Sequence, residues 1–141
     1  MAKSNPVNIR LENEVLNEIK KLAKTLRLSL SAVLNRLIIE SVRMYQFPGI
    51  IFVTSPSGRR AAVSGTGLDV WELVLIYQRY KKNEKKLLHD YPLTQMQLYA
   101  ALNYYAKYKK EIDDEIKENN RIEDLLIHTK EFPEVISLNL E

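Results

Sequence analysis

Hydrophobic and polar positions alternate near the start of the chain and then recur at helical spacing. Val7, Ile9 and Leu11 alternate with Asn8 and Arg10, and this period of two predicts a short strand with one apolar face. A strand this short is not stable alone in water, and the sequence that follows it contains helical patterns before any further strand pattern. We therefore expect it to pair with the same strand of a second copy, as a two-stranded ribbon.

Two amphipathic helices are predicted after this strand. Apolar positions fall on one helical face over residues 13–26, and Ser29 is a suitable N-cap for a second helix over about 30–44. Pro48-Gly49 then ends the unit and marks a domain boundary. The core of the expected dimer combines the strand with the second helix, through Val7, Ile9, Leu11, Leu34 and Leu37.

The order strand, helix, serine-capped turn, helix resembles the ribbon-helix-helix family of dimeric repressors (the CopG, Arc and MetJ type) over about residues 5–45. The resemblance implies that the ribbon enters the DNA major groove, where its outward residues Asn8 and Arg10 read bases. One departure is Arg27, because the family usually has glycine in the turn before the second helix.

The resemblance also implies a phosphate clamp at the start of the second helix. The free backbone amides there belong to Ser29, Leu30 and Ser31, and a helix N-terminus carries a partial positive charge that suits an anion. Lys3, in the arm that precedes the strand, is available for a further phosphate.

A second unit is predicted from about Phe47. Two short apolar runs around a Pro- and Gly-containing turn predict a β-hairpin, and Ser64–Gly67 reads as a turn that leads into a helix. Three helices follow, over 70–80, 84–90 and 94–108, the last two capped by Asn83 and Thr94.

Landmarks of this second unit occur in a fixed order. They are Pro48-Gly49-Ile50, Arg60, Gly65-Thr66-Gly67, Val70-Trp71, Tyr91-Pro92-Leu93-Thr94 and Ala100-Ala101-Leu102-Asn103-Tyr104-Tyr105. Over about residues 48–118 they resemble a small homeodomain-like domain of unknown function. That domain occurs in antitoxin-like proteins encoded beside a PIN-type nuclease toxin, so the resemblance implies such a toxin as partner.

Composition narrows the possible functions. The chain has no Cys and only two His, so we expect no disulfide, no metal site and no cofactor. The sequence also has no paired nucleophile and base, so we do not expect an enzyme. There is no membrane-length apolar run and no signal-peptide core, which favours a cytoplasmic protein. Residues 1–47 carry +4, residues 48–110 carry +6 and residues 111–141 carry −7, a division that suits a polyanion partner for the body of the chain.

Several residues have both a functional and a structural interpretation. Trp71 is expected in the core, and His89 is expected to be partly buried. The consecutive acids Asp113, Asp114 and Glu115 are expected to be solvated, since neighbours on a helix do not face one site. The tyrosines near residues 99–108 favour packing over base stacking. Helix 94–108 also offers polar side chains for reading DNA, but an αα unit is equally a dimer or partner platform.

The acidic end contains apolar residues that a purely solvating tail does not need. Two fates fit residues 120–141: packing on their own module, or wrapping a partner after being mobile in the free protein. We prefer the second, with toxin contacts through Leu125, Leu126, Ile127, Val135 and Ile136.

The sequence therefore predicts a mainly α fold with short β elements: a ribbon-helix-helix dimer (1–46), a β-hairpin plus three-helix module (47–119) and a tail (120–141). The function we expect is that of a DNA-binding antitoxin and autorepressor in a type II toxin–antitoxin pair. It would bind double-stranded DNA, its own operator, as a homodimer or higher oligomer, and we expect no association with a membrane. The alternatives are a transcriptional or plasmid copy-control repressor without a toxin and, more weakly, a nucleoid or partition protein.

Overall fold

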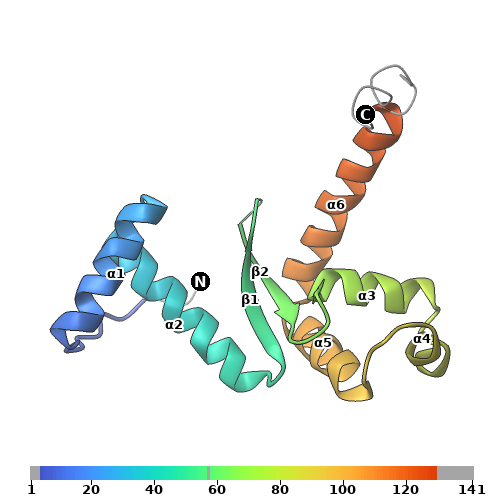
Figure 1. The fold of residues 1–141 in the computed structure, drawn as a ribbon, viewed down its shortest axis with the longest axis horizontal. Helices are drawn as coiled ribbons and strands as arrows, with labels where there is room; N and C mark the ends of the chain where they lie inside the picture. Colours follow the sequence, from blue (N-terminus) through green and yellow to red (C-terminus); the bar gives the residue numbers. More distant parts are fainter. Residues whose placement is uncertain (1–3, 57, 130–141) are drawn as a thin grey trace. The chain divides into compact units, whose positions relative to one another are not determined.

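The computed structural model describes residues 4–56 and 58–129, with side chains to residue 121 (Figure 1). The chain divides into two compact units, Met1–Arg43 and Met44–Glu141. The described residues form six helices and one three-stranded sheet, so the prediction of a mainly α fold with short β elements is confirmed.

The first unit contains α1 (Asn13–Leu26) and the larger part of α2 (Leu30–Gln46), the helices that the apolar spacing predicts. The turn between them closes with two backbone bonds, from Leu28 N–H to the Ala23 carbonyl (3.0 Å) and from Arg27 N–H to the Lys24 carbonyl (3.3 Å). Arg27 has φ 55° and ψ 42°, the left-handed conformation that glycine usually supplies in this motif. The departure from glycine therefore keeps the shape of the turn, at a cost of about 1 kcal/mol.

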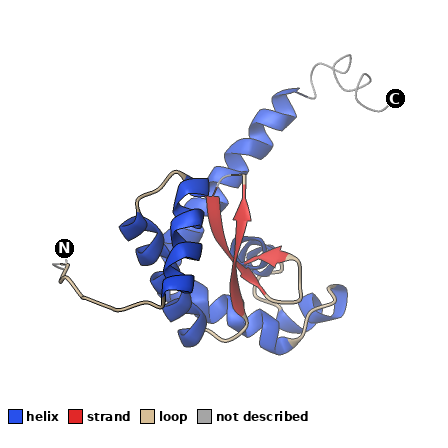
Figure 2. Cartoon of the chain, turned by 60° about the vertical axis from the view of Figure 1, so that its left-hand side comes forward, coloured by secondary structure: helices blue, strands red, loops and turns tan. Residues whose placement is uncertain are grey.

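The second unit begins with a small antiparallel sheet of order β1-β2-β3, drawn as red arrows in Figure 2. The predicted hairpin is formed by β1 (Ile50–Ser55) and β2 (Gly58–Val63), with Ile50 opposite Val63. A third strand, β3 (Leu68–Asp69), was not expected and pairs with the end of β2. The chain reverses between β2 and β3 through the two glycines of the predicted turn, Gly65 and Gly67, both at positive φ.

Four helices follow the sheet. They are α3 (Val70–Arg79), α4 (Glu84–Asp90), α5 (Gln95–Lys107) and α6 (Lys109–Thr129). Both predicted caps are confirmed: the Asn83 side chain accepts from the Lys86 N–H, and the Thr94 hydroxyl accepts from the Gln97 N–H, each at 3.1 Å. The Gln97 side chain in turn accepts from the Thr94 N–H (2.9 Å), which completes a capping box.

Tyr104 lies at the centre of the core of this unit and is fully buried. Its ring meets Phe47 and Phe52 edge-on, with centroids 5.4 and 6.4 Å away, and its hydroxyl donates to Glu111 (2.8 Å). Helix α6 adds Ile112 and Ile116 to the same core. These two isoleucines are one helical turn apart and so lie on the same face of α6. Because both are buried in the core, the first turns of the acidic segment are part of the packed module. Beyond the core α6 continues as a long helix (Figure 1).

The expectation of solvation holds for Asp114, which is exposed and pairs with Lys110 at 2.8 Å, but it is wrong for Glu115. Glu115 shares a helix face with Ile112 and Ile116, so it is drawn toward the module and is half-buried. Its Oε2 atom is buried and has no hydrogen-bond partner among the described residues.

Burial raises the pKa of Glu115 to about 7, and the opposing charge of Arg60 lowers it less than burial raises it. A carboxyl whose pKa is higher in the folded chain binds its proton more tightly there. Protonation of Glu115 therefore stabilises the folded state fully at pH below about 4.5, the ordinary pKa of a glutamate. This stabilisation is lost as the pH rises through about 7.

Glu115→Gln should raise the free energy of unfolding at pH 8 by about 1–2 kcal/mol, allowing for solvent screening of a half-exposed group, and should change it little at pH 4. Denaturant titrations at both pH values measure this difference. Asp114→Asn on the exposed face serves as the control, with an expected change under about 0.5 kcal/mol. Equal stability of Glu115→Gln and the original chain at pH 8 would show that the charge carries no penalty.

Candidate nucleic-acid interface

The segment before α1 is exposed in the single chain. Residues 4–12 form neither helix nor strand, and residues 4–10 are all exposed. Val7 is 80% exposed and Ile9 56%, although both are apolar, while Leu11 is half-buried. The predicted ribbon pairs two copies, so a single chain does not test it; the apolar face that would form it is uncovered.

The helices of the first unit also lack a complete core. Among its described residues only Ala23 and Val33 are buried hydrophobics, while Leu34 and Leu37 are half-buried. A groove of about 510 Å³ lies on α1, and its lining consists of Glu14, Val15, Glu18, Ile19 and Leu22. Large apolar side chains remain exposed along both helices, namely Val15, Leu22, Leu26, Ile38, Ile39 and Val42.

Asn8 and Arg10 lie exposed in this extended segment, alternating with Val7 and Ile9. Neither side chain has a hydrogen bond or an ion pair within the described part of the chain. An Asn can bond bidentately to adenine and an Arg to guanine in the major groove. Both predicted base-reading groups are therefore accessible and uncommitted.

The predicted phosphate clamp has the geometry of a capped helix start. The Ser29 hydroxyl accepts from the Ala32 N–H (3.1 Å), and the Ser29 carbonyl accepts from the Val33 N–H (3.1 Å), so Ser29 is the N-cap as predicted. The amides of Leu30 and Ser31 precede the first intrahelical bond, and nothing within the helix accepts from them. An anion can bind to these amides. Lys3 lies outside the described residues.

The polar side chains of α5 are largely used within the protein. Gln95 Nε2 donates to Glu84 (2.8 Å) and to the Tyr99 hydroxyl (3.0 Å), and Gln97, besides capping the helix, donates to the Ser64 carbonyl (3.3 Å). Asn103 is exposed. A DNA-reading role for α5 would have to break the glutamine bonds, so we do not include it in the interface.

The aromatic residues of the second unit are mainly structural. Tyr104 is buried, and Tyr105 and Tyr108 are half-buried against the core, which fits packing better than base stacking. Trp71 packs on the same core, as predicted, and its Nε1 donates to Asp69 (3.0 Å). His89 does not follow the expectation of partial burial: its side chain is 87% exposed beside Asp90, because it lies on the outer face of the short helix α4.

The residues predicted to bind a toxin lie in the C-terminal part of α6 and beyond it. Leu125, Leu126 and Ile127 lie in α6, but their side chains are not described. Val135 and Ile136 lie outside the described residues. The role of this segment and its mobility in the free protein stay predictions.

The described residues offer neither a metal-binding cluster nor a membrane-spanning helix. Over residues 4–56 and 58–121, whose side chains are described, no three His, Asp or Glu side chains lie close enough together to hold a metal ion. None of the helices there is both long and apolar enough to cross a membrane.

Comparison with known proteins adds no relative. The chain matches no protein-family model, no curated protein and no solved structure. The functional assignment therefore rests on the residues and their geometry.

Proposed function

We propose that this chain is a dimeric DNA-binding antitoxin that represses transcription of its own operon. The observation that carries the proposal is the combination, in one short unit, of an uncovered apolar face with uncommitted Asn8 and Arg10 side chains beside it. A unit of about 40 residues does not usually fold without a further source of burial.

A second copy is the simplest source of that burial. Pairing residues 7–11 of two chains would satisfy backbone groups that a single extended segment leaves open. The same pairing would cover Val7 and Ile9 and turn Asn8 and Arg10 to the opposite face. A ribbon of two strands fits the major groove, and the net charge of +4 over residues 1–47 favours a polyanion.

The antitoxin role concerns the second unit and the acidic segment. The second unit has its own core around Tyr104, so it does not need the first unit for burial. Residues 111–141 carry −7, a charge complementary to the basic surface of a toxin that acts on nucleic acid. The alternative is a repressor without a toxin, in which the second unit dimerises or binds an effector. Co-expression with the product of the adjacent gene, followed by pull-down, separates the two.

Arg10→Ala should weaken binding to the chain's own promoter by about 1–3 kcal/mol for each base that the arginine reads, and should relax sequence preference. Lys3→Ala is the control, because removal of a phosphate-binding cation weakens binding to all sequences alike and reduces the salt dependence. Gel shifts on the promoter and on a scrambled duplex measure both effects. Unchanged affinity and selectivity for Arg10→Ala would exclude the ribbon from base reading.

Deleting residues 120–141 should leave operator binding intact and abolish neutralisation of the toxin. The deletion keeps Ile112 and Ile116, so the core of the second unit remains. Gel shifts and growth of cells that express the toxin measure the two activities separately. Neutralisation by the shortened chain, or strong protection of 120–129 from hydrogen exchange in the free protein, would assign this segment a structural role instead.

A further inference from the structure

A concentration of basic side chains surrounds the turn between α3 and α4. Five cations occur within eight residues, and all of them are exposed. We call this set the α3–α4 basic patch; it consists of Arg79, Lys81, Lys82, Lys85 and Lys86.

The charges of this patch are not neutralised within the described part of the chain. None of its five side chains forms an ion pair or a hydrogen bond there. The Lys86 ammonium lies 5.7 Å from the centre of the Tyr80 ring and is attracted at longer range by Asp90. Lysines on α6 behave differently: Lys109 pairs with Asp113 and Lys110 with Asp114, each at 2.8 Å. The patch therefore keeps a positive potential that α6 does not.

Glu84 and Asp90, the acidic residues close to the patch in the sequence, form their hydrogen bonds with residues outside the patch. Glu84 accepts hydrogen bonds from Gln95 (2.8 Å) and from the Tyr99 hydroxyl (3.0 Å). Asp90 accepts from the Tyr80 hydroxyl (2.8 Å) and contacts His89 (3.1 Å). The hydrogen bond to Asp90 raises the pKa of Tyr80 to about 12, so Tyr80 stays neutral and adds no negative charge to the patch.

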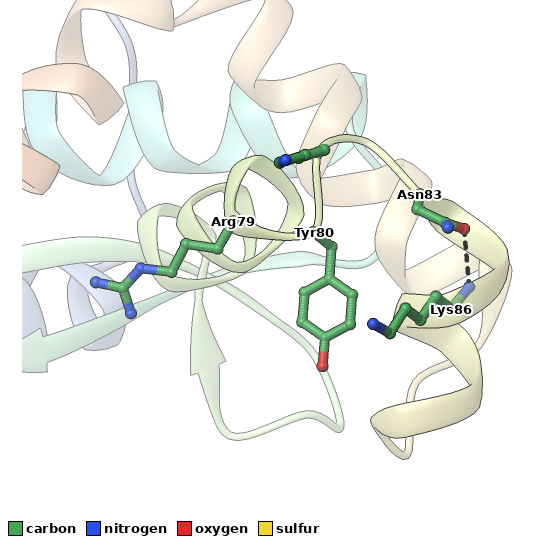
Figure 3. Close-up of a pocket in the computed structure, with 5 residues that line it drawn as sticks. Arg79, Tyr80, Asn83 and Lys86 are labelled. Atoms are coloured by element: carbon green, nitrogen blue, oxygen red, sulfur yellow. Dashed lines mark hydrogen bonds between the residues drawn. The ribbon is translucent and has the colours of Figure 1, made fainter.

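Three of these cations, Arg79, Lys81 and Lys86, line a hollow of about 490 Å³ together with Tyr80 and Asn83. In Figure 3 the Tyr80 ring stands between the side chains of Arg79 and Lys86, and the Lys86 ammonium points toward the ring. Asn83 accepts from the Lys86 backbone N–H and holds that end of the turn (Figure 3).

The backbone of the turn has an unusual conformation for its sequence. Lys81 and Lys82 are consecutive non-glycine residues in the left-handed region, at φ 52° and 62°. Their N–H groups donate to the carbonyls of Gln78 (2.9 Å) and Tyr77 (3.0 Å), which holds the turn in shape. Lysines in the left-handed region and like charges close together both lower the stability of the folded chain. Such a cost is typical of a site that binds a ligand.

We propose that the α3–α4 basic patch binds the phosphate backbone of duplex DNA, as a contact separate from the ribbon. The proposal rests on the DNA-binding function proposed above and gives each chain a second, sequence-independent site. Linked sites on one polyanion strengthen overall binding without new base contacts.

Two other polyanionic partners fit the patch less well. Stacking of single-stranded bases needs a free aromatic face, but the Tyr80 ring is half-buried, next to Lys86 and edge-on to Tyr91 with centroids 5.9 Å apart. Insertion into a lipid surface needs exposed apolar side chains, and the lining of the hollow has none beyond the half-buried Tyr80.

The test compares the full chain with the variant Arg79→Gln/Lys81→Gln/Lys86→Gln. The matched control is Lys109→Gln/Lys110→Gln/Lys117→Gln, which removes the same charge from the same unit. Fluorescence anisotropy with a labelled duplex of unrelated sequence is measured across a salt titration, after circular dichroism confirms that each variant is folded. The patch variant should bind about tenfold more weakly at low salt, and its slope of log K against log salt should fall by about 0.9 for each phosphate that the variant no longer neutralises.

Equal affinity and slope for the patch variant and the control would overturn the proposal. Loss of binding to a single-stranded oligonucleotide of the same sequence, with duplex binding unchanged, would also overturn it. Failure of the proposed function is distinguishable, because it would appear as unchanged operator selectivity in Arg10→Ala while the slope of the patch variant still falls. Failure of the patch would leave the effect of Arg10→Ala intact.

Discussion

Incomplete burial in the first unit is the constraint on which the rest of this protein depends. Two amphipathic helices and an extended segment leave Val7, Ile9 and a row of helix side chains in contact with solvent, and only Ala23 and Val33 are buried hydrophobics among the described residues of the unit. Burial of a large aliphatic side chain is worth about 1.5–3 kcal/mol, so a face of this extent strongly favours association. The symmetric pairing that we propose would cover this face and would also position polar side chains for the major groove.

The second unit meets the same requirement within one chain. Tyr104 joins the sheet, α5 and α6 through its ring contacts and its bond to Glu111, and capped helix starts fix the turns between helices. The charged side chains of this unit fall into separate groups: those at the start of α6 pair with one another, whereas those of the α3–α4 basic patch do not. The ion pairs at the start of α6 stabilise the helix itself, whereas the unpaired cations of the patch support the phosphate contact proposed for it.

Elements with a regular period or a strong cap could be predicted from the sequence, and elements set by tertiary contacts could not. Ser29, Asn83 and Thr94 mark helix starts because their side chains accept bonds from first-turn amides. Strand β3 is only two residues long and has no period to detect. The burial of Glu115 depends on its neighbours Ile112 and Ile116, and the exposure of His89 depends on which face α4 packs. The five cations of the patch are visible in the sequence, but the left-handed turn that carries two of them and their lack of ion pairs depend on the folded structure. Alternation alone separates Asn8 and Arg10 from the apolar positions, but their interpretation as base-reading residues follows from the resemblance to the ribbon-helix-helix family, and their pairing involves a second chain.

Disulfide crosslinking at the centre of the proposed ribbon tests the central claim most directly. The chain has no cysteine, so Ile9→Cys introduces a single thiol. In a twofold antiparallel pairing of residues 7–11, residue 9 lies opposite itself, with Cα atoms about 5 Å apart, a separation that a disulfide spans. Asn8→Cys is the matched control, because its copies lie diagonally at about 7–8 Å, beyond ordinary disulfide geometry. A ribbon dimer predicts that mild oxidation converts Ile9→Cys, far more than Asn8→Cys, into a covalent dimer that still binds DNA. Equal crosslinking of the two variants, or a folded chain that stays monomeric, would contradict it.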